Sequence, residues 1–287
     1  MDKRIFLAEP RGFCFGVKNA LNIVEEAVNK YPQRAICLYN EIVHNRTVVD
    51  ELKAKGIIFT KEIAKIPPNA VVIISAHGAP PMIKKEIELK NLILMDATCP
   101  LVQKIHDEVN KYSADGYHII YIGSKDHDEA GGVIAENPHN ISVVGSADDI
   151  NKIETGHSKY MVLTQTTLNM FEVAELFKKI RNKLPNVDFP NKKDLCYATA
   201  ERQSAVKKLA AQCDLFLVLG SENSSNSRKL RDIAAEHCRA FLIDNYREIK
   251  PTWLNKVKAV GITSGASAPE FLVEELIRYL NGQGFSL

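Results

Sequence analysis

The sequence lacks long apolar runs, has little proline and carries almost no net charge, and each absence excludes a class of protein. No apolar stretch approaches the ~18 residues that a membrane-spanning helix needs. Only 12 of the 287 residues are proline and 45% are hydrophobic, which excludes a disordered or collagen-like chain. Lys and Arg number 37 against 35 Asp and Glu, so the net charge of +2 predicts no nucleic-acid partner. We expect a globular protein with no membrane partner.

The spacing of the cysteines excludes further classes. The six cysteines show neither CxxC nor CxxxC spacing, which rules out zinc ribbons and ferredoxin-like runs. Too few apolar residues precede Glu9 and Pro10 for a signal-peptide core, so the sequence predicts a cytoplasmic location, which disfavours disulfides. Cys37, Cys213 and Cys238 lie among apolar residues. We expect these three to pack as small hydrophobic residues.

The other three cysteines each lie in a short polar or glycine-rich turn ahead of an amphipathic helix. After Cys14 the apolar residues recur at helical spacing, and similar patterns follow Cys99 and Cys196. Predicted strands precede the first two turns, and a weaker segment precedes the third; these are residues 4–8, 92–96 and 189–195. The common pattern indicates an internal repeat.

The same order of elements continues downstream of each cysteine. A buried strand, a polar loop, a weak strand and a strong strand with a second polar loop follow in each third of the chain. Three similar α/β units account for this order, with predicted boundaries at 1–91, 92–190 and 191–287. Alternating strands and helices predict small, mainly parallel sheets, which bind ligands at the carboxyl ends of their strands. Pseudo-threefold packing around a central cavity would gather these loops.

Polar side chains that can bind a ligand or transfer a proton lie in the predicted strand-end loops. Histidines, hydroxyls and amides, together with N–H groups at helix starts, can hold a diphosphate with little net charge. A glutamate in such a loop can serve as a general acid. Unit by unit, the candidates are His44 and His77; His127, Glu129 and Thr166; Ser224, Ser225, Asn226 and Ser267.

Three converging thiolates with no equivalent fourth cysteine leave more than one function open. They can hold an iron–sulfur cluster or a zinc ion with one open position. An iron–sulfur reductase, a zinc hydrolase or lyase, and a binding protein for phosphorylated ligands all fit the loops. Cysteine-only ligation beside a diphosphate site favours redox chemistry over zinc, and a binding protein would not need the cysteines. Iron and sulfide analysis of protein purified without oxygen distinguishes the three.

Longer motifs carry a more specific signal than these spacings. In chain order they are PRGFCFGV (10–17), IVHNRTVVD (42–50), SAHGAP (75–80), DATCPLVQKIH (96–106), TQTTLN (164–169), CYATAERQ (196–203), GSENSSNS (220–227) and GASAP (265–269). This ordered set spans nearly the whole chain. It resembles the motifs of the 4-hydroxy-3-methylbut-2-enyl diphosphate reductases, the last enzymes of the non-mevalonate isoprenoid route.

The resemblance implies a fold of three α/β units around a central cavity and a 4Fe-4S cluster held by Cys14, Cys99 and Cys196. It implies reductive dehydroxylation of the allylic diphosphate substrate to isopentenyl and dimethylallyl diphosphate, with electrons from a donor such as ferredoxin or flavodoxin. Glu129, Thr166 and His127 match the catalytic residues, and Glu129 and Thr166 organise proton delivery to the departing hydroxyl. The residues that match the substrate site are His44, His77, His127, Thr166, Ser224, Ser225, Asn226 and Ser267.

One position departs from the family pattern. The family usually shows His-Pro-Glu, whereas this chain has Asp128 between His127 and Glu129. A carboxylate that points inward would raise the pKa of Glu129 by like-charge repulsion. We expect Asp128 to face solvent instead, where it would leave the acid unchanged.

Overall fold

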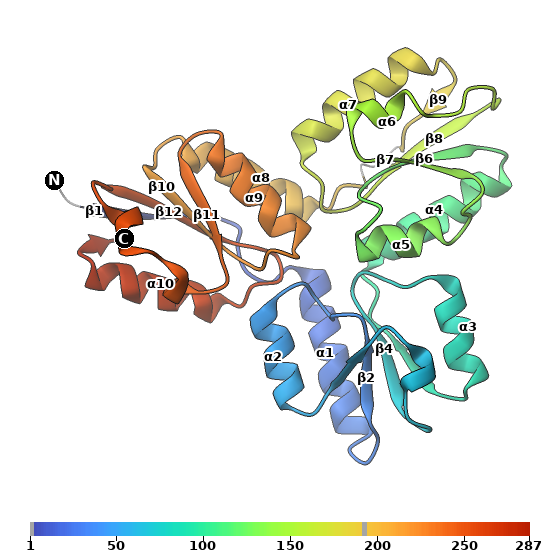
Figure 1. Ribbon diagram of the computed structural model, residues 1–287, viewed down its shortest axis with the longest axis horizontal. Coiled ribbons are helices and arrows are strands. Elements are labelled where there is room, and N and C mark those ends of the chain that lie inside the picture. Colours follow the sequence, from blue (N-terminus) through green and yellow to red (C-terminus); the bar gives the residue numbers. More distant parts are fainter. Residues whose placement is uncertain (1–2, 191–193) are drawn as a thin grey trace. The chain divides into compact units, whose positions relative to one another are not determined.

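The computed structural model describes residues 3–190 and 194–287, which form three small β-sheets flanked by helices (Figure 1). Every strand pair in the described residues is parallel, as the sequence predicts. The chain divides into a larger body (18–42 and 53–196) and a smaller body (1–17, 43–52 and 197–287), described separately below. No helix in the described ranges is long and apolar enough to cross a membrane.

The first sheet lies in the larger body and has the strand order β3-β2-β4-β5. Its strands are continuous apolar runs because parallel strands are covered on both faces. Cys37 is fully buried in the core formed with α3, and burial raises the pKa of its thiol. The elements of this part of the chain are α1 (Phe15–Lys30), β2 (Ile36–Tyr39), α2 (Arg46–Ala54), β3 (Ile58–Thr60), η1 (Ile63–Lys65), β4 (Val71–Ile74), α3 (Pro81–Leu89) and β5 (Ile93–Asp96).

The second sheet, also in the larger body, has the order β7-β6-β8-β9. Successive side chains of a strand point to opposite faces. Ile120 and Ile122 therefore pack against α6 and α7, whereas Ile119 and Tyr121 pack against α4 and α5 (Figure 1). The elements are α4 (Pro100–Ala114), β6 (His118–Ile122), α5 (Asp128–Ile134), β7 (Ile141–Val144), α6 (Ala147–Ile150), β8 (Tyr160–Thr164), α7 (Met170–Lys183) and β9 (Val187–Asp188).

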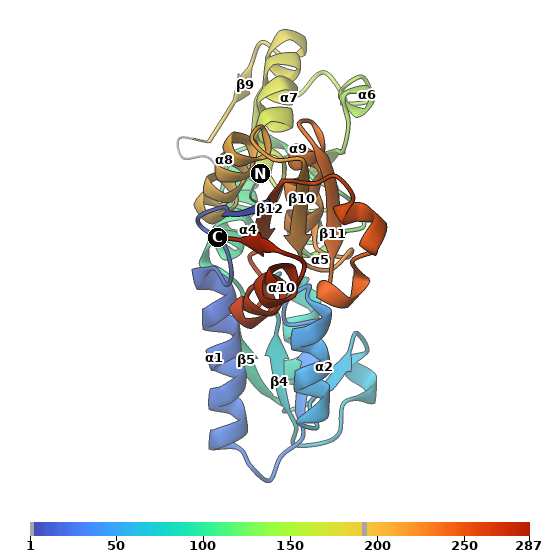
Figure 2. The same ribbon diagram turned by 90° about the vertical axis from the view of Figure 1, so that its left-hand side faces the viewer.

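The third sheet forms the smaller body and has the order β11-β10-β12-β1-β13. Leu217 faces α10, whereas Phe216 and Val218 face α8 and α9, so the helices cover both faces (Figures 1 and 2). Cys213 and Cys238 pack against the second of these cores, as expected, and burial raises the pKa of Cys213 to about 12. The elements are β1 (Lys3–Leu7), α8 (Tyr197–Ala210), β10 (Leu215–Leu219), α9 (Ser225–Ala235), β11 (Arg239–Ile243), η2 (Tyr246–Glu248), η3 (Pro251–Leu254), β12 (Ala259–Ser264), α10 (Glu270–Gly282) and β13 (Phe285–Ser286).

Two of the three strands that precede the repeat cysteines pair with a different sheet from the one that the predicted boundaries assign to them. Strand β1 pairs with β12 and β13, β5 pairs with β4, and β9 pairs with β8. A helix that crosses back over a parallel sheet places the next strand beside the previous one, which explains β5 and β9. Strands β1 and β5 thus cross the predicted boundaries of 1–91, 92–190 and 191–287, whereas β9 lies in the same predicted segment as β8. Within the predicted segment 189–195, residues 191–193 lie outside the described residues.

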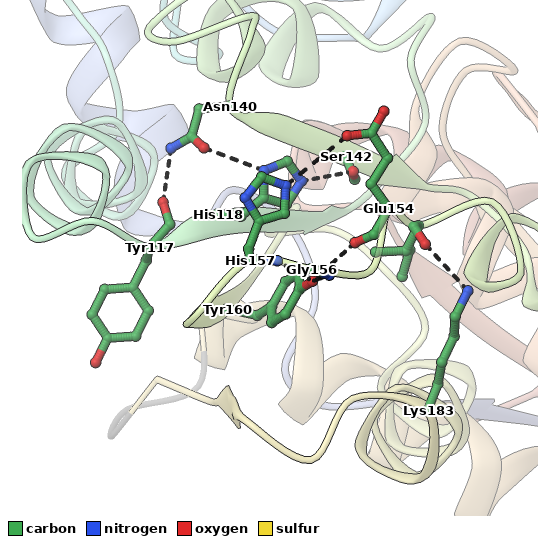
Figure 3. Close-up of polar contacts among 10 residues, drawn as sticks. Tyr117, His118, Asn140, Ser142, Glu154, Gly156, His157, Tyr160 and Lys183 are labelled. Carbon is green, nitrogen blue, oxygen red and sulfur yellow. Dashed lines mark hydrogen bonds and ion pairs between the residues drawn. The ribbon is translucent and has the colours of Figure 1, made fainter.

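A histidine cluster lies at the amino-terminal edge of the second sheet, opposite the strand-end loops (Figure 3). His118 is only 5% exposed, and its two ring nitrogens lie 3.2 Å from Asn140 Oδ1 and 2.8 Å from Ser142 Oγ. The ring of His157 stacks on it with 4.2 Å between centroids. Burial and the neighbouring His157 lower the pKa of His118, and the contacts with Asn140 and Glu154 offset this only in part. The cluster favours neutral His118.

This cluster predicts a specific pH dependence of stability. Because the pKa of His118 is lower in the folded than in the unfolded chain, stability is lost as the pH falls through the unfolded value of about 6.5. Between pH 7.5 and 5.5, the Tm of His118→Gln should therefore fall less than that of the wild type. Replacement of the exposed His139 by Gln removes no buried group and is the control. Equal falls in Tm for His118→Gln and the wild type would contradict the argument.

Candidate active site

Each of the three repeat cysteines directly precedes a helix and is anchored in the same way. Helices α1, α4 and α8 begin one residue after Cys14, Cys99 and Cys196, as predicted. The three backbone N–H groups donate to loops that follow the strands β12, β4 and β8; the acceptors are the carbonyl oxygens of Ala266 (3.1 Å), Ala76 (3.0 Å) and Thr166 (3.1 Å). Parallel pairing places these loops beside the cysteine turns. All three thiols are partly exposed, and no disulfide joins the cysteines of the described residues.

The predicted site residues fall into two groups, one in each body. The larger body holds Cys99, Cys196, His77, His127, Glu129 and Thr166, and the smaller body holds Cys14, His44, Ser224, Ser225, Asn226 and Ser267.

In the larger body, Glu129 is 1% exposed, and its carboxylate is held by Thr166 in the loop that follows β8. Its Oε1 accepts the backbone N–H of Thr166 at 2.8 Å, and its Oε2 accepts the Thr166 hydroxyl at 2.7 Å. Glu129 lies in the first turn of α5, where its own N–H donates to Nδ1 of His127, the residue that caps the helix. Both carboxylate oxygens are therefore fixed in place.

The two histidines connect this carboxylate to the first sheet. The rings of His77 and His127 meet edge to face with their centroids 5.8 Å apart. His77 follows Ala76, whose carbonyl anchors the Cys99 turn. A continuous series of contacts thus runs from Cys99 through the histidines and Glu129 to Thr166 and on to Cys196. All six predicted residues of the larger body belong to it.

Glu129 titrates far from its ordinary range. Burial raises its pKa from 4.5 to about 7, although the two hydrogen bonds from Thr166 act in the opposite direction, and Asp194 raises it further. A carboxylic acid with this pKa holds a proton for part of the time at neutral pH. Glu129 therefore has the property that a general acid needs.

Asp128 pairs with a lysine. Its Oδ1 lies 3.0 Å from Nζ of Lys61, which follows β3 and is largely exposed. The groups that shift the pKa of Glu129 are its burial, Thr166 and Asp194, and Asp128 is not among them. Asp128 therefore does not face solvent as expected: its side chain is only 19% exposed and is held by an ion pair that the sequence did not reveal.

Two residues that lie beside the site, Asp194 and Lys104, were not identified from the sequence. Asp194 has a fully buried carboxylate that accepts the N–H of Thr164 at 3.2 Å and pairs with Lys104 at 2.6 Å. Burial raises the pKa of Asp194 to about 6. Partial burial alone would lower the pKa of Lys104, but hydrogen bonds with Asp194 and Glu108 outweigh it and raise the pKa. The sequence could not indicate this contact, because an isolated Asp and a Lys in a helix form no motif when 90 residues separate them.

In the smaller body, the Cys14 turn is held by the third sheet. Gly12 adopts a φ of +69°, which favours glycine, and its N–H donates to Ser264 Oγ at 2.8 Å. The buried Arg202 donates to the carbonyl oxygen of Gly12 at 2.7 Å. The next strand-end loop continues the contacts, since the hydroxyl of Ser267 donates to the carbonyl oxygen of His44 at 3.0 Å.

The start of α9 has the features of an anion site. Ser224 caps the helix by accepting the N–H of Ser227, and Ser225 begins the helix. Asn226 is 5% exposed, yet neither its Oδ1 nor its Nδ2 has a hydrogen-bond partner among the described residues. Buried polar groups are nearly always paired, so an unpaired amide at a helix start points to a ligand. Gly265 allows the close approach, because a Cβ there would lie 2.1 Å from Ser227 Oγ.

The raised pKa of Glu129 predicts how its replacement changes stability with pH. Between pH 4.5 and about 7 the folded chain holds a proton that the unfolded chain has released, so wild-type stability declines as the pH rises through this window. Glu129→Gln carries no such proton. Its Tm should therefore rise relative to the wild type between pH 5 and 8.5, by the equivalent of up to roughly 3 kcal/mol. Parallel curves of Tm against pH would show that the carboxyl titrates normally.

Comparison with known proteins agrees with the motifs. Residues 5–281 match the family model described as LytB protein. The chain is 45% identical to 4-hydroxy-3-methylbut-2-enyl diphosphate reductase of Neorickettsia sennetsu, over 96% of this chain and 91% of that protein. It is 44% identical to the enzyme of the same name from Magnetococcus marinus, over 98% and 92%.

A solved structure is also similar to the chain over its whole length. The E-1-hydroxy-2-methyl-but-2-enyl-4-diphosphate reductase of Plasmodium falciparum aligns with a TM-score of 0.95 at 34% identity, covering 100% of this chain and 92% of that one. The family model covers every residue of the contact series, and several relatives exceed 40% identity. The chain therefore belongs to the LytB protein family.

Proposed function

We propose that the chain reduces 4-hydroxy-3-methylbut-2-enyl diphosphate to isopentenyl and dimethylallyl diphosphate, the last step of the non-mevalonate route. The C–O bond of the allylic alcohol breaks, a C–H bond forms, and two electrons and two protons are consumed as the hydroxyl leaves as water. Family membership and the names of the relatives support this reaction. The observation that carries it is the series of contacts that links a protonatable glutamate to two of the repeat cysteines.

The cofactor that we propose is a 4Fe-4S cluster held by Cys14, Cys99 and Cys196. These thiols are partly exposed, and each sits at a helix start, which favours an anionic ligand set. Of the other three cysteines, Cys37 lies in a hydrophobic core and Cys213 and Cys238 pack against another, and none of the three directly precedes a helix. When bound, the cluster would pass on the two electrons from an external donor and would offer a Lewis-acidic iron to the departing hydroxyl.

Glu129 is the proposed proton donor. Thr166 fixes both carboxylate oxygens, so the acid keeps one orientation while its pKa of about 7 allows it to be protonated at neutral pH. The proton on this carboxyl would be given to the hydroxyl as the C–O bond breaks. His127 caps the helix that carries Glu129 and thereby contributes to its placement. Thr166 and His127 thus belong to the catalytic group as well as to the substrate site.

The diphosphate is proposed to lie against hydroxyls, amides and histidines rather than against lysines and arginines. Asn226 has two unsatisfied amide atoms, and the serines beside it stand at the N-terminal end of an 11-residue helix, where the helix dipole favours an anion. Hydroxyls, amides and histidines bind phosphate without a strongly basic surface, in keeping with the net charge of +2. The proposed set is His44, His77, His127, Thr166, Ser224, Ser225, Asn226 and Ser267. A donor such as ferredoxin or flavodoxin and a cytoplasmic location complete the proposal.

The metal content of the protein tests the cofactor. Protein purified without oxygen should carry about four irons and four sulfides per chain. Serine at Cys14, Cys99 or Cys196 should abolish the cluster, because each thiol is a ligand. Serine at Cys37, Cys213 or Cys238 is the matched control and should retain it. A colourless protein with stoichiometric zinc would replace this proposal with a zinc enzyme, and one with neither metal would favour a binding protein.

Replacement of the proposed acid tests the reaction. Glu129→Gln keeps the shape of the side chain but has no proton to give. Turnover with the substrate and an artificial electron donor should fall by about 10² to 10⁴, while iron content stays at the wild-type level. Asp128→Asn is the neighbouring control and should change turnover little, since its carboxylate pairs with Lys61. Turnover of Glu129→Gln within a few-fold of the wild type would remove Glu129 from the mechanism.

A further inference from the structure

The Lys104–Asp194 ion pair joins two elements that carry proposed cluster ligands. Asp194 lies two residues before Cys196, and its side chain is 0% exposed. Lys104 lies in α4, which begins directly after Cys99, and its Nζ is 2.6 Å from Asp194 Oδ1. The pair ties the Cys196 turn to the helix that follows Cys99, across 90 residues of sequence.

The same carboxylate also fixes the end of β8. Asp194 Oδ2 accepts the N–H of Thr164 at 3.2 Å. Two residues further on, the carbonyl of Thr166 accepts the N–H of Cys196, and its N–H and hydroxyl hold Glu129. The three-residue segment 164–166 is therefore held by Asp194, Cys196 and Glu129 together. A shift of the Asp194 carboxylate would move both the ligand turn and the residue that orients the acid.

Because the Asp194 carboxylate is buried, the ion pair should be disrupted by replacement of either partner. A buried carboxylate without its cation is strongly unfavourable, so loss of Lys104 would force Asp194 to move towards solvent or to take up a proton. Glu108 lies 3.0 Å from Lys104 but sits on the same helix, so it cannot replace the link to the Cys196 turn. The link thus depends on two side chains.

We propose that Lys104 and Asp194 form a positioning pair that holds the Cys196 turn and segment 164–166 in register with helix α4. The inference rests on the proposed function in taking Cys99 and Cys196 as ligands. Neither residue is assigned contact with substrate or cluster. Their effect is exerted through the backbone of Thr164 and Cys196.

Local hydrogen exchange tests the positioning without any metal. In Lys104→Met and Asp194→Ala, peptides that contain Thr164 and Cys196 should exchange about tenfold faster than in the wild type, which corresponds to ~1.4 kcal/mol. Peptides of β10 in the smaller body should be unchanged. Lys104→Arg, which keeps the charge, should restore slow exchange. Lys178→Met is the matched control, because Lys178 makes an ion pair of the same 2.6 Å length at an exposed position.

Iron release tests the consequence for the cluster. When a chelator is added to anaerobically purified protein, iron should leave Lys104→Met and Asp194→Ala about 10- to 100-fold faster, the range for loss of groups that support metal ligands. The double variant Lys104→Met/Asp194→Ala should match Asp194→Ala, because both changes break one link. If the increase in iron release of the double variant equals the product of the increases in the two single variants, the two residues act independently, and the proposed positioning pair is wrong.

The two measurements separate this inference from the proposed function. A wild type that contains no iron would contradict the proposed function, and hydrogen exchange would then decide the positioning role. Iron present, with exchange and release in both single variants within twofold of the wild type, would overturn the inference and leave the proposed function standing. Loss of protection throughout the chain would also overturn it, because that result would indicate a general contribution to stability.

Discussion

Parallel strand pairing is the constraint on which the site depends. In a parallel sheet the carboxyl ends of neighbouring strands lie at one edge, so the loops that follow two paired strands are neighbours. This places each cysteine turn beside the loop after β12, β4 or β8, where a backbone carbonyl accepts the cysteine N–H. The three turns are equivalent because the same pairing is repeated in three sheets. The side chains at the equivalent positions differ, which allows one repeat to supply an acid and another an amide.

The burial of Glu129 shows how the larger body adapts a carboxyl to acid chemistry. Removal from water disfavours the charged form, and two hydrogen bonds from Thr166 limit that effect without cancelling it. The result is an acid that titrates near neutral pH and is held in one orientation. A carboxyl in this state lowers stability above its unfolded pKa, so the fold accepts a local cost at the position where a mobile proton is useful.

The smaller body uses neutral groups in place of charge. Serines and Asn226 at the start of α9 present hydroxyls, an unpaired amide and helix N–H groups, which together favour an anion. This arrangement explains why a chain with a net charge of only +2 and no basic run can be proposed to bind a diphosphate. Lys61 serves another purpose, since it pairs with Asp128 beside the acid.

The sequence by itself determined the local elements and their repetition. Continuous apolar runs and helical periodicity predicted the strands and the helices after Cys14, Cys99 and Cys196, because burial and backbone geometry act over a few residues. The tertiary structure decided which sheet each strand joins, as with β1 in the third sheet, and which distant side chains meet, as with Lys104 and Asp194. Such contacts leave no periodic trace, because they depend on the folding of the whole chain rather than on the spacing of neighbouring residues.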